Sequence, residues 1–260
     1  MRGIEGKRVL ISGGCGDIGQ AVAARFLAGG ARVVIADKTH TSDGAALASR
    51  LHDQRAHFRQ CDVTSPDSVV DAVAFACEWM GGLDVAISNA GAVANAPFLS
   101  VTLEDWRRIL DINLTGSFLF AQTAARAMLR NASEKSAHRG SILFTGSWVQ
   151  QMPWPQGAGY CSSKGGQEML MKVAAQELAA EGITCNIVAP GFVYAGLTKR
   201  IYDSDEEFRL RADKAIPLRR LSTADEVAGA FLFLASADGA YITGTSLLVD
   251  GGASLVKRGE

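Results

Sequence analysis

Residues 8–19 read RVLISGGCGDIG, and the rest of the chain can be understood outward from them. The apolar, β-branched run at 8–12 predicts a buried strand, and a helical pattern follows at 18–28. Glycines at such a strand-to-helix turn let the backbone approach a pyrophosphate, and the helix N-terminus favours the anion. The glycines at 14, 16 and 19 fit the general dinucleotide pattern, although a tight structural turn would fit it too.

Strand and helix patterns alternate along the remaining chain. Further strand candidates are 32–37, 56–62, 85–89, 141–145, 184–189 and 246–249, and further helical patterns are 65–79, 103–130, 159–180 and 224–234. Repetition of strand, crossover and strand predicts one α/β Rossmann domain over 1–260, with a doubly wound parallel sheet of about seven strands and helices on both faces. Gly29-Gly30 and Gly81-Gly82 mark two helix ends. The charged segment at about 192–216 has no clear strand and is predicted to be a substrate lid.

The composition excludes several classes of protein. Apolar residues make up 48% of the chain, charged residues make up 20%, and the net charge is −1, which gives no reason to expect binding to nucleic acid or a membrane surface. No apolar run approaches the roughly 20 residues that cross a bilayer, and the N-terminus lacks the apolar core of a signal peptide. The 5 cysteines and 4 histidines show no metal-ligand spacing. We therefore expect a cytoplasmic protein with a small-molecule partner and no metal.

Asp37 strengthens the dinucleotide interpretation. It ends the second predicted strand, about 20 residues after the glycine turn, where a carboxylate can accept hydrogen bonds from the hydroxyls of an adenosine ribose. The same carboxylate would repel the 2′-phosphate of NADP, so the sequence favours NAD as the cofactor. Lys38 could soften that preference, which leaves NADP open.

Polar residues also follow the next two strands. Asp62-Val63 comes after the third strand and Asn89-Ala90-Gly91 after the fourth. Ligands of such sheets bind outside the carboxyl ends of the strands, so Asp62 could reach the adenine while 89–91 lies along the cofactor. An Asx turn before Ser65-Pro66 explains Asp62 equally well.

Ser147, Tyr160 and Lys164 form the most distinctive group. Tyr160 and Lys164 are separated by one helical turn, so the ammonium can lie near the phenol oxygen. Tyrosine ionises near pH 10, and a nearby positive charge is expected to lower that pKa toward the range of a useful base. The hydroxyl of Ser147, at the end of the fifth strand, can bond a substrate oxygen.

Taken together, these motifs resemble the short-chain dehydrogenase/reductase superfamily, in its single-domain branch of about 250 residues. The resemblance runs from Gly6 to Gly252 and is carried by SGGCGDIG, Asp37, CDV, SNAG, the DIN that contains Asn113, Ser147, YCSSK and the APG that ends at Gly191. It implies an NAD-dependent oxidoreductase with a catalytic tetrad of Asn113, Ser147, Tyr160 and Lys164.

The resemblance also implies a role for each of these residues. Tyr160 would remove the hydroxyl proton during oxidation or donate one during reduction, and Ser147 would orient the substrate oxygen. Lys164 would hold the nicotinamide ribose and lower the pKa of the tyrosine. Asn113 would support a water chain from Lys164 to solvent. The implied cofactor contacts are Ser12, Gly13, Cys15, Asp17, Ile18, Gly19, Asp37, Lys38, Asp62, Val63, Asn89, Ala90, Gly91, Tyr160, Lys164, Pro190, Gly191 and Val193.

Three positions depart from the family pattern, and the mildest change is Ser12, which replaces a threonine and keeps the hydroxyl. Asp17 replaces a glycine next to the expected pyrophosphate, and we expect it to act as a helix N-cap that points away. Ala195 replaces a threonine that often binds the carboxamide. Thr198 could substitute for that threonine, and otherwise the main chain of Val193 would recognise the nicotinamide.

The substrate is indicated only by side chains around these motifs. Trp148 and Trp154 with Gln150, Gln151 and Gln156 combine flat apolar faces with amides, a mixture that suits a sugar. Lys199-Arg200 could hold an anionic group of the substrate. The predicted substrate contacts are Ser147, Trp148, Gln150, Trp154, Tyr160, Lys199 and Arg200. The tryptophans could instead pack internally, and the two cations could form a solvated helix face.

These side chains favour a sugar 1-dehydrogenase that oxidises the anomeric hydroxyl to a lactone, with an acidic sugar such as sulfoquinovose or a uronate among the candidates. The alternative is a 3-oxo compound reductase or a polyol or secondary-alcohol dehydrogenase. A non-catalytic dinucleotide sensor is a third class, which would have no need of all four tetrad residues. The segment LLVDGGAS at 247–254 resembles one that packs in oligomers of the family, which implies a homotetramer.

Overall fold

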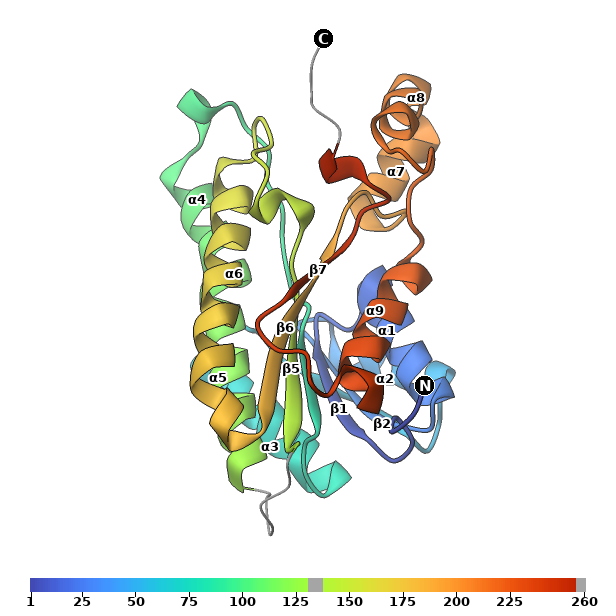
Figure 1. Ribbon diagram of the computed structural model, residues 1–260, viewed down its shortest axis with the longest axis vertical. Helices are drawn as coiled ribbons and strands as arrows, with labels where there is room; N and C mark the ends of the chain where they lie inside the picture. The colour runs from blue at the N-terminus through green and yellow to red at the C-terminus, as the bar shows by residue number, and fades with distance from the viewer. Residues whose placement is uncertain (131–137, 256–260) are drawn as a thin grey trace.

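A parallel sheet of seven strands forms the centre of the computed structural model, which describes residues 1–130 and 138–255 (Figure 1). In the order β3-β2-β1-β4-β5-β6-β7, all neighbouring strands pair in parallel. Their bounds are β1 Arg8–Ser12, β2 Arg32–Asp37, β3 Ala56–Gln60, β4 Val85–Ser88, β5 Gly140–Thr145, β6 Ile183–Pro190 and β7 Ser246–Val249. The predicted fold class is confirmed.

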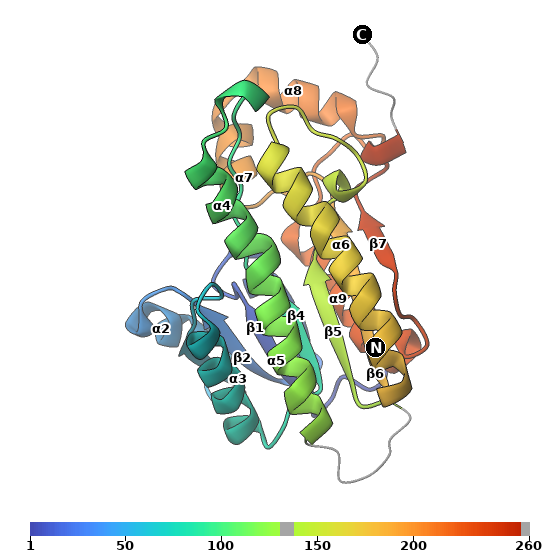
Figure 2. The same ribbon diagram turned by 90° about the vertical axis from the view of Figure 1, so that its left-hand side faces the viewer.

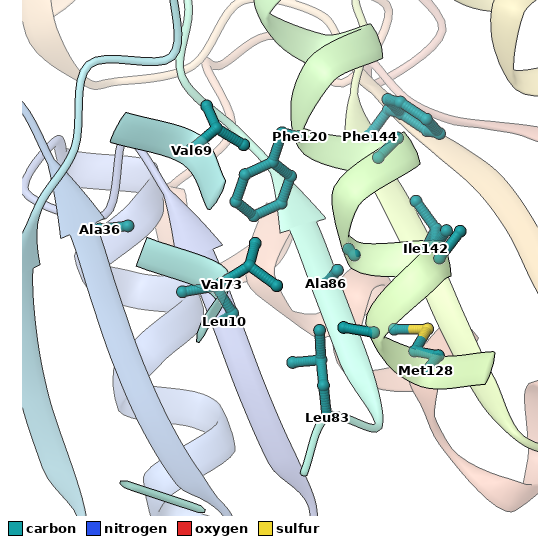
Figure 3. Close-up of a cluster of buried hydrophobic side chains, with 14 of the residues drawn as sticks. Leu10, Ala36, Val69, Val73, Leu83, Ala86, Phe120, Met128, Ile142 and Phe144 are labelled. Atoms are coloured by element: carbon teal, nitrogen blue, oxygen red, sulfur yellow. The ribbon is translucent and has the colours of Figure 1, made fainter. Parts of the chain in front are cut away.

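Helices cover both faces of the sheet. One face carries α1 Asp17–Ala28, α2 Thr41–Leu51 and α9 Ala224–Ala235, and the opposite face carries α3 Pro66–Met80, α5 Gly116–Arg130 and α6 Ala158–Leu178 (Figures 1 and 2). The inner strands β1 and β4 are buried on both faces, which explains their unbroken apolar runs. Figure 3 shows how Phe120 of α5 packs over the sheet beside Val69 and Val73 of α3. All three side chains are buried, and they help to hold the strand ends in place.

The glycine pairs end helices as predicted. Gly81 adopts a left-handed conformation (φ 77°) directly after α3, and Gly30 (φ 90°) follows α1. Two strands are shorter than predicted. β3 ends at Gln60 and β4 at Ser88, because the backbone N–H groups of Asp62 and Asn89 bond to the hydroxyls of Ser68 and Ser12 outside the ladder.

The helix predicted at 103–130 is interrupted. It consists of α4 (Leu103–Leu110), a π-helical turn at Asp111–Thr115 and α5, with the N–H of Gly116 bonded to the carbonyl of Asp111. A Cβ at Gly116 would lie 2.9 Å from Cγ2 of Val63, so the close approach of α5 to the strand end needs glycine there. The π turn places Asn113 at the carboxyl edge of the sheet.

Three helices were not predicted. They are α2 and, inside the charged segment 192–216, α7 (Gly196–Ser204) and α8 (Glu206–Ala215). The α2 sequence contains Gly44, which lowers helix propensity but lets the helix lie against the ring of Phe58. Pairs such as Glu206–Arg209 and Glu207–Arg211 supply local support for α8. Together α7 and α8 stand beyond the carboxyl edge of the sheet (Figure 1).

Candidate active site

A cavity of about 1150 Å³ opens along the carboxyl edge of the sheet. It spans the ends of β1 and β4, where the strand order reverses and ligands of such folds bind. The wall includes sixteen residues predicted to bind the cofactor: Gly13, Asp17, Ile18, Gly19, Asp37, Lys38, Asp62, Val63, Asn89, Ala90, Gly91, Tyr160, Lys164, Pro190, Gly191 and Val193. The fold therefore gathers at one cavity residues that lie up to 180 positions apart (193 − 13).

Ser12 and Cys15 lie behind this wall. The buried hydroxyl of Ser12 accepts hydrogen bonds from the N–H groups of Asn89 (3.1 Å) and Ala90 (3.3 Å), and the amide of Asn89 donates to the carbonyl of Gly13 (2.8 Å). At Gly13 (φ 63°) a Cβ would meet the Cα of Ala90 at 2.6 Å. The two loops thus pack backbone against backbone. This packing leaves the glycine turn bare toward the cavity at the N-terminus of α1, an arrangement that fits a pyrophosphate.

Asp37 lies on the wall at the end of β2. One carboxylate oxygen accepts from the N–H of Cys15 (3.0 Å), and the other accepts from the N–H (3.1 Å) and hydroxyl (2.9 Å) of Thr39. A carboxylate has about four acceptor positions, so one remains for a hydroxyl in the cavity. This geometry fits the ribose of a dinucleotide.

Asp62 forms the Asx turn, which was the alternative to an adenine contact. Its Oδ1 accepts from the hydroxyl (2.7 Å) and the N–H (2.9 Å) of Thr64, and these bonds lower the pKa of the carboxyl. The residue nevertheless lies on the cavity wall, so the turn and an adenine contact are compatible.

The prediction that Asp17 is an N-cap is wrong. Gly16 occupies that position and Asp17 is the first residue of α1. The Oδ2 atom of Asp17 accepts a hydrogen bond from the N–H of Gly196 (2.7 Å), the first residue of α7. The carboxylate therefore links the glycine turn to the segment predicted to be a lid.

Tyr160 and Lys164 project from α6 onto the wall, and the end of β5 supplies their partners. Ser147 is buried and is not on the cavity wall, but its hydroxyl lies close enough to the phenol of Tyr160 to lower the pKa of that phenol. The Nζ atom of Lys164 donates to the carbonyl of Thr145 (2.7 Å) and lies 5.8 Å from the centroid of the Tyr160 ring. A substrate oxygen beside the phenol would be within reach of both hydroxyls.

Burial dominates the protonation of this pair. It raises the pKa of Tyr160, and the hydrogen bond from Ser147 opposes that rise. Burial also lowers the pKa of Lys164 to about 8. The expected lowering of the Tyr160 pKa is therefore not found in this structure, because burial of the phenol raises that pKa instead. At neutral pH the phenol is protonated and suited to donate a proton.

Asn113 is fully buried in the π turn. Its side chain accepts from the N–H of Ala92 (2.8 Å) and donates to the carbonyl of Ala92 (2.9 Å) and the hydroxyl of Ser163 (3.0 Å). It therefore holds the loop after β4 against α6. Sequence reasoning missed Thr145, Ser163 and Gln167 around it. A polar residue three positions after Lys164, on the buried face of α6, was the available signal for Gln167.

Most of the predicted substrate contacts do not lie on the cavity wall. Gln150 is turned inward, where its Oε1 accepts from the N–H of Ser147 (3.2 Å) and its Nε2 donates to Ser246 (2.9 Å). Gln151 donates to the carboxylate of Glu168 (2.8 Å). These amides are used for internal hydrogen bonds, which corrects the prediction that Gln150 faces the substrate.

Trp148 and Trp154 pack with Phe192 in an aromatic cluster, with ring centroids 5.4–5.7 Å apart. Neither tryptophan is on the cavity wall, in line with the internal-packing alternative. Lys199 lies over the ring of Tyr194 (5.3 Å to the centroid), and neither Lys199 nor Arg200 reaches the wall. Both cations are exposed to solvent, so the predicted anion site is not part of this cavity.

Over the described ranges 1–130 and 138–255, no three or more His, Cys, Asp or Glu side chains group closely enough to hold a metal ion. No helix in the same part of the chain has the length and hydrophobicity to span a membrane.

The sheet is doubly wound, and the glycine turn lies at the cavity where its strand order reverses. Tyr160 and Lys164 line the same cavity. This combination defines a nicotinamide-dependent oxidoreductase. Residues 15–254 match a family model described as enoyl-(acyl carrier protein) reductase. The chain belongs to the short-chain dehydrogenase/reductase family, as its motifs indicated.

Two curated relatives cover nearly the whole chain. The 3-oxoacyl-(acyl-carrier-protein) reductase MabA of Mycobacterium bovis is 36% identical over 249 residues, which are 96% of this chain and 93% of the relative. The 3β-hydroxysteroid dehydrogenase 1 of Eggerthella lenta is 34% identical over 258 residues, 97% and 95% of the two chains. A crystal structure of a short-chain type dehydrogenase/reductase from Mycobacterium marinum superposes with a TM-score of 0.87 at 34% identity and covers 96% of both chains. The chain is thus an enzyme that acts between hydroxyl and keto groups.

Proposed function

We propose that this enzyme interconverts a ketone and a secondary alcohol on an apolar substrate, with NAD(H) as the cofactor. The observation that carries this proposal is that four of the side chains predicted to bind a sugar contact other protein groups instead. Gln150 and Gln151 bond internally, and Trp148 packs against Trp154 and Phe192. The geometry therefore supports the 3-oxo reductase or secondary-alcohol dehydrogenase alternative better than oxidation of a sugar to a lactone.

Part of the wall on the α4 side supports an apolar substrate, although Glu104, Arg107, Arg108 and Asp111 line the same side. Val93 and Leu103 line the cavity and are 43% and 60% exposed. Phe98 and Leu99, on the short turn between them, are almost fully exposed as well. Apolar side chains left in water around a cavity mark a surface that gains free energy when an apolar ligand covers it. Substrates of the two relatives, by their names an acyl chain and a steroid, are of this kind.

The tetrad residues would act on the substrate oxygen. In the reductive direction Tyr160 donates its proton to the carbonyl oxygen, and Ser147 holds that oxygen by its hydroxyl. Lys164 would bond the nicotinamide ribose with the donor that its contacts to protein leave free. When bound, the nicotinamide supplies or accepts the hydride. The non-catalytic alternative does not account for Tyr160 and Lys164 together on the cavity wall.

Asp37 supports NAD over NADP. Its carboxylate faces the cavity with Thr39 and Cys15 bonded behind it, and a phosphate placed there would meet a negative charge. Thr198 reaches the wall close to Ala195, so its hydroxyl can serve where the family threonine is missing. We extend the proposal to the segment 192–216, in which α7 and α8 would close over the substrate.

The test is the absorbance of NADH or NADPH with purified enzyme and three groups of substrates: 3-oxoacyl thioesters, 3-keto and 3-hydroxysteroids, and neutral and acidic sugars. We expect turnover of a thioester or a steroid with NAD(H). Tyr160→Phe should lower kcat by a factor of at least about 10³, because phenylalanine keeps the ring and lacks the hydroxyl that donates the proton. Turnover confined to sugars would overturn the substrate proposal. An active Tyr160→Phe enzyme would overturn the role of the tyrosine.

A further inference from the structure

The ammonium of Lys164 has a second protein partner that the catalytic residues do not explain. Besides the carbonyl of Thr145, it donates to the Oε1 atom of Gln167 at 3.2 Å. Gln167 lies one turn further along α6 and is fully buried. A buried glutamine loses its hydration, so the bonds that it makes inside the protein determine its orientation.

The other end of this amide is anchored to a different part of the fold. Its Nε2 atom donates to the hydroxyl of Ser117 (2.7 Å) and to the carbonyl of Asn113 (3.3 Å). The Ser117 hydroxyl donates in turn to the carbonyl of Asn113 (2.7 Å) and accepts from Ser88 on β4 (3.0 Å). Gln167 therefore connects Lys164 to the π turn, to α5 and to the sheet.

Chemistry assigns the orientation of the amide. An ammonium has only donors and a carbonyl only accepts, so Oε1 must face Lys164 and Nε2 must face Asn113. The carbonyl of Asn113 already accepts from Ser117 and Gln167. Asn113 is thus connected to Lys164 through the side chain of Gln167.

We propose that Gln167 is a positioning residue that holds the Lys164 ammonium beside Tyr160, and that Ser117 and the Asn113 carbonyl act on the catalytic pair through it. This inference rests on the roles of Tyr160 and Lys164 in the proposed function. A neutral acceptor stabilises a buried ammonium without cancelling its charge, so it favours the protonated form of Lys164, which in turn favours the phenolate. A carboxylate in the same place would neutralise it.

The experiment measures the ionisation of Tyr160 directly. Phenolate absorbance is titrated with NAD bound, and the curve of Tyr160→Phe is subtracted in each background. Among the described residues, Cys161 acts on the pKa of Tyr160 and Lys164 lies 5.8 Å from its ring centroid, both from α6, while β5 and the turn after it present the neutral Thr145 and Ser147. In Gln167→Met, which keeps the side-chain volume, we expect the titration of Tyr160 to move up by about one pH unit and kcat to fall about tenfold, with little change in KM.

Two further variants sharpen the result. Ser117→Ala keeps Gln167 but removes its anchor, so it should move the titration in the same direction by less, and it should add nothing in the Gln167→Met background. Thr184→Val removes a buried hydroxyl bond to Ser141, far from the site, and should leave the titration and kcat unchanged. Ser117→Ala also tests the inference if Gln167→Met does not fold.

An unshifted Tyr160 titration in folded Gln167→Met and in Ser117→Ala would overturn this inference alone, provided that Tyr160→Phe is inactive. Additive effects of the two substitutions would also overturn it, because Ser117 would then act by another route. Turnover by Tyr160→Phe would instead refute the proposed function, whatever Gln167 does.

Discussion

Lys164 shows how a single residue relates stability to function in this enzyme. Its ammonium is buried between α6 and the end of β5 and has neutral hydrogen-bond acceptors for partners. Burial without an opposite charge makes the protonated form costly, and the pKa of Lys164 falls from 10.5 to about 8. A lysine with such a pKa changes its charge near working pH, which suits a site that moves protons.

This shift makes folding stability depend on pH. Between about pH 8 and 10.5 the unfolded chain keeps a proton that folded Lys164 has lost, so wild type gains stability as pH rises through this range. Below pH 8 the full cost of the buried charge is present. In urea unfolding, we expect the free energy of unfolding of wild type relative to Lys164→Met to rise by up to about 3 kcal/mol from neutral to strongly alkaline pH. A constant difference would show that the ammonium is not destabilised by burial.

Asp37 provides the second prediction at a single residue. Asp37→Ala removes the charge that opposes the 2′-phosphate and leaves Lys38 to attract it, so the ratio of kcat/KM with NAD to that with NADP should fall at least about tenfold. Thr39→Ala, which loses only a partner of the carboxylate, serves as the control and should change the ratio far less. An unchanged ratio in Asp37→Ala would mean that the selecting residue lies elsewhere.

The effect of a glycine substitution on stability depends on the position of that glycine in its helix. Gly81 ends α3 with φ 77°, whereas Gly229 lies inside α9 with ordinary helical φ, and a Cβ at either would meet nothing within 4 Å. An added methyl group has space at both positions, so the backbone conformation determines how a substitution changes the free energy of unfolding.

We expect Gly81→Ala to lower the free energy of unfolding by about 1 kcal/mol, because alanine is strained at positive φ. Gly229→Ala should raise it by about 0.5–1 kcal/mol, because glycine costs conformational entropy inside a helix. Chemical denaturation of both variants checks the pair. Equal effects of the two substitutions would contradict this assignment of conformations.

Helices α5 and α6 lie on the same face of the sheet (Figure 2), and both carry exposed apolar side chains. Phe118 of α5 and the Met169–Val173 pair of α6 are each more than 40% exposed. Together with the family-like segment 247–254, these side chains support the homotetramer that the resemblance implies.

Sedimentation velocity should accordingly give a tetramer. Charges at a self-associating helix face repel one another, so Met169→Glu combined with Val173→Glu should convert the tetramer into smaller species. Val70→Glu, at a residue of α3 that is 54% exposed, should leave the tetramer intact. A monomeric wild type would refute the assembly.

The local order of residues was sufficient for the class of fold and for the family. Short apolar runs that alternate with helical patterns predict a doubly wound sheet, because burial on both faces and crossover connections leave few other arrangements. Motifs within a few residues of one another, such as SGGCGDIG and YCSSK, also predicted a cofactor turn and a catalytic pair, and the fold brings the two to one cavity. Helix α2 was not predicted because Gly44 lowers its helix propensity, and the close packing of Gly44 against Phe58 is a tertiary contact.

The directions of polar side chains came only from long-range packing. Gln150 donates to Ser246, 96 positions away, and Gln167 donates to Ser117, 50 positions away. Asp17 likewise found its partner, Gly196, 179 residues along the chain. A hydrogen bond tolerates a change of only a few tenths of an ångström in the distance from donor to acceptor. When the two groups are remote in sequence, only the folded chain sets that distance.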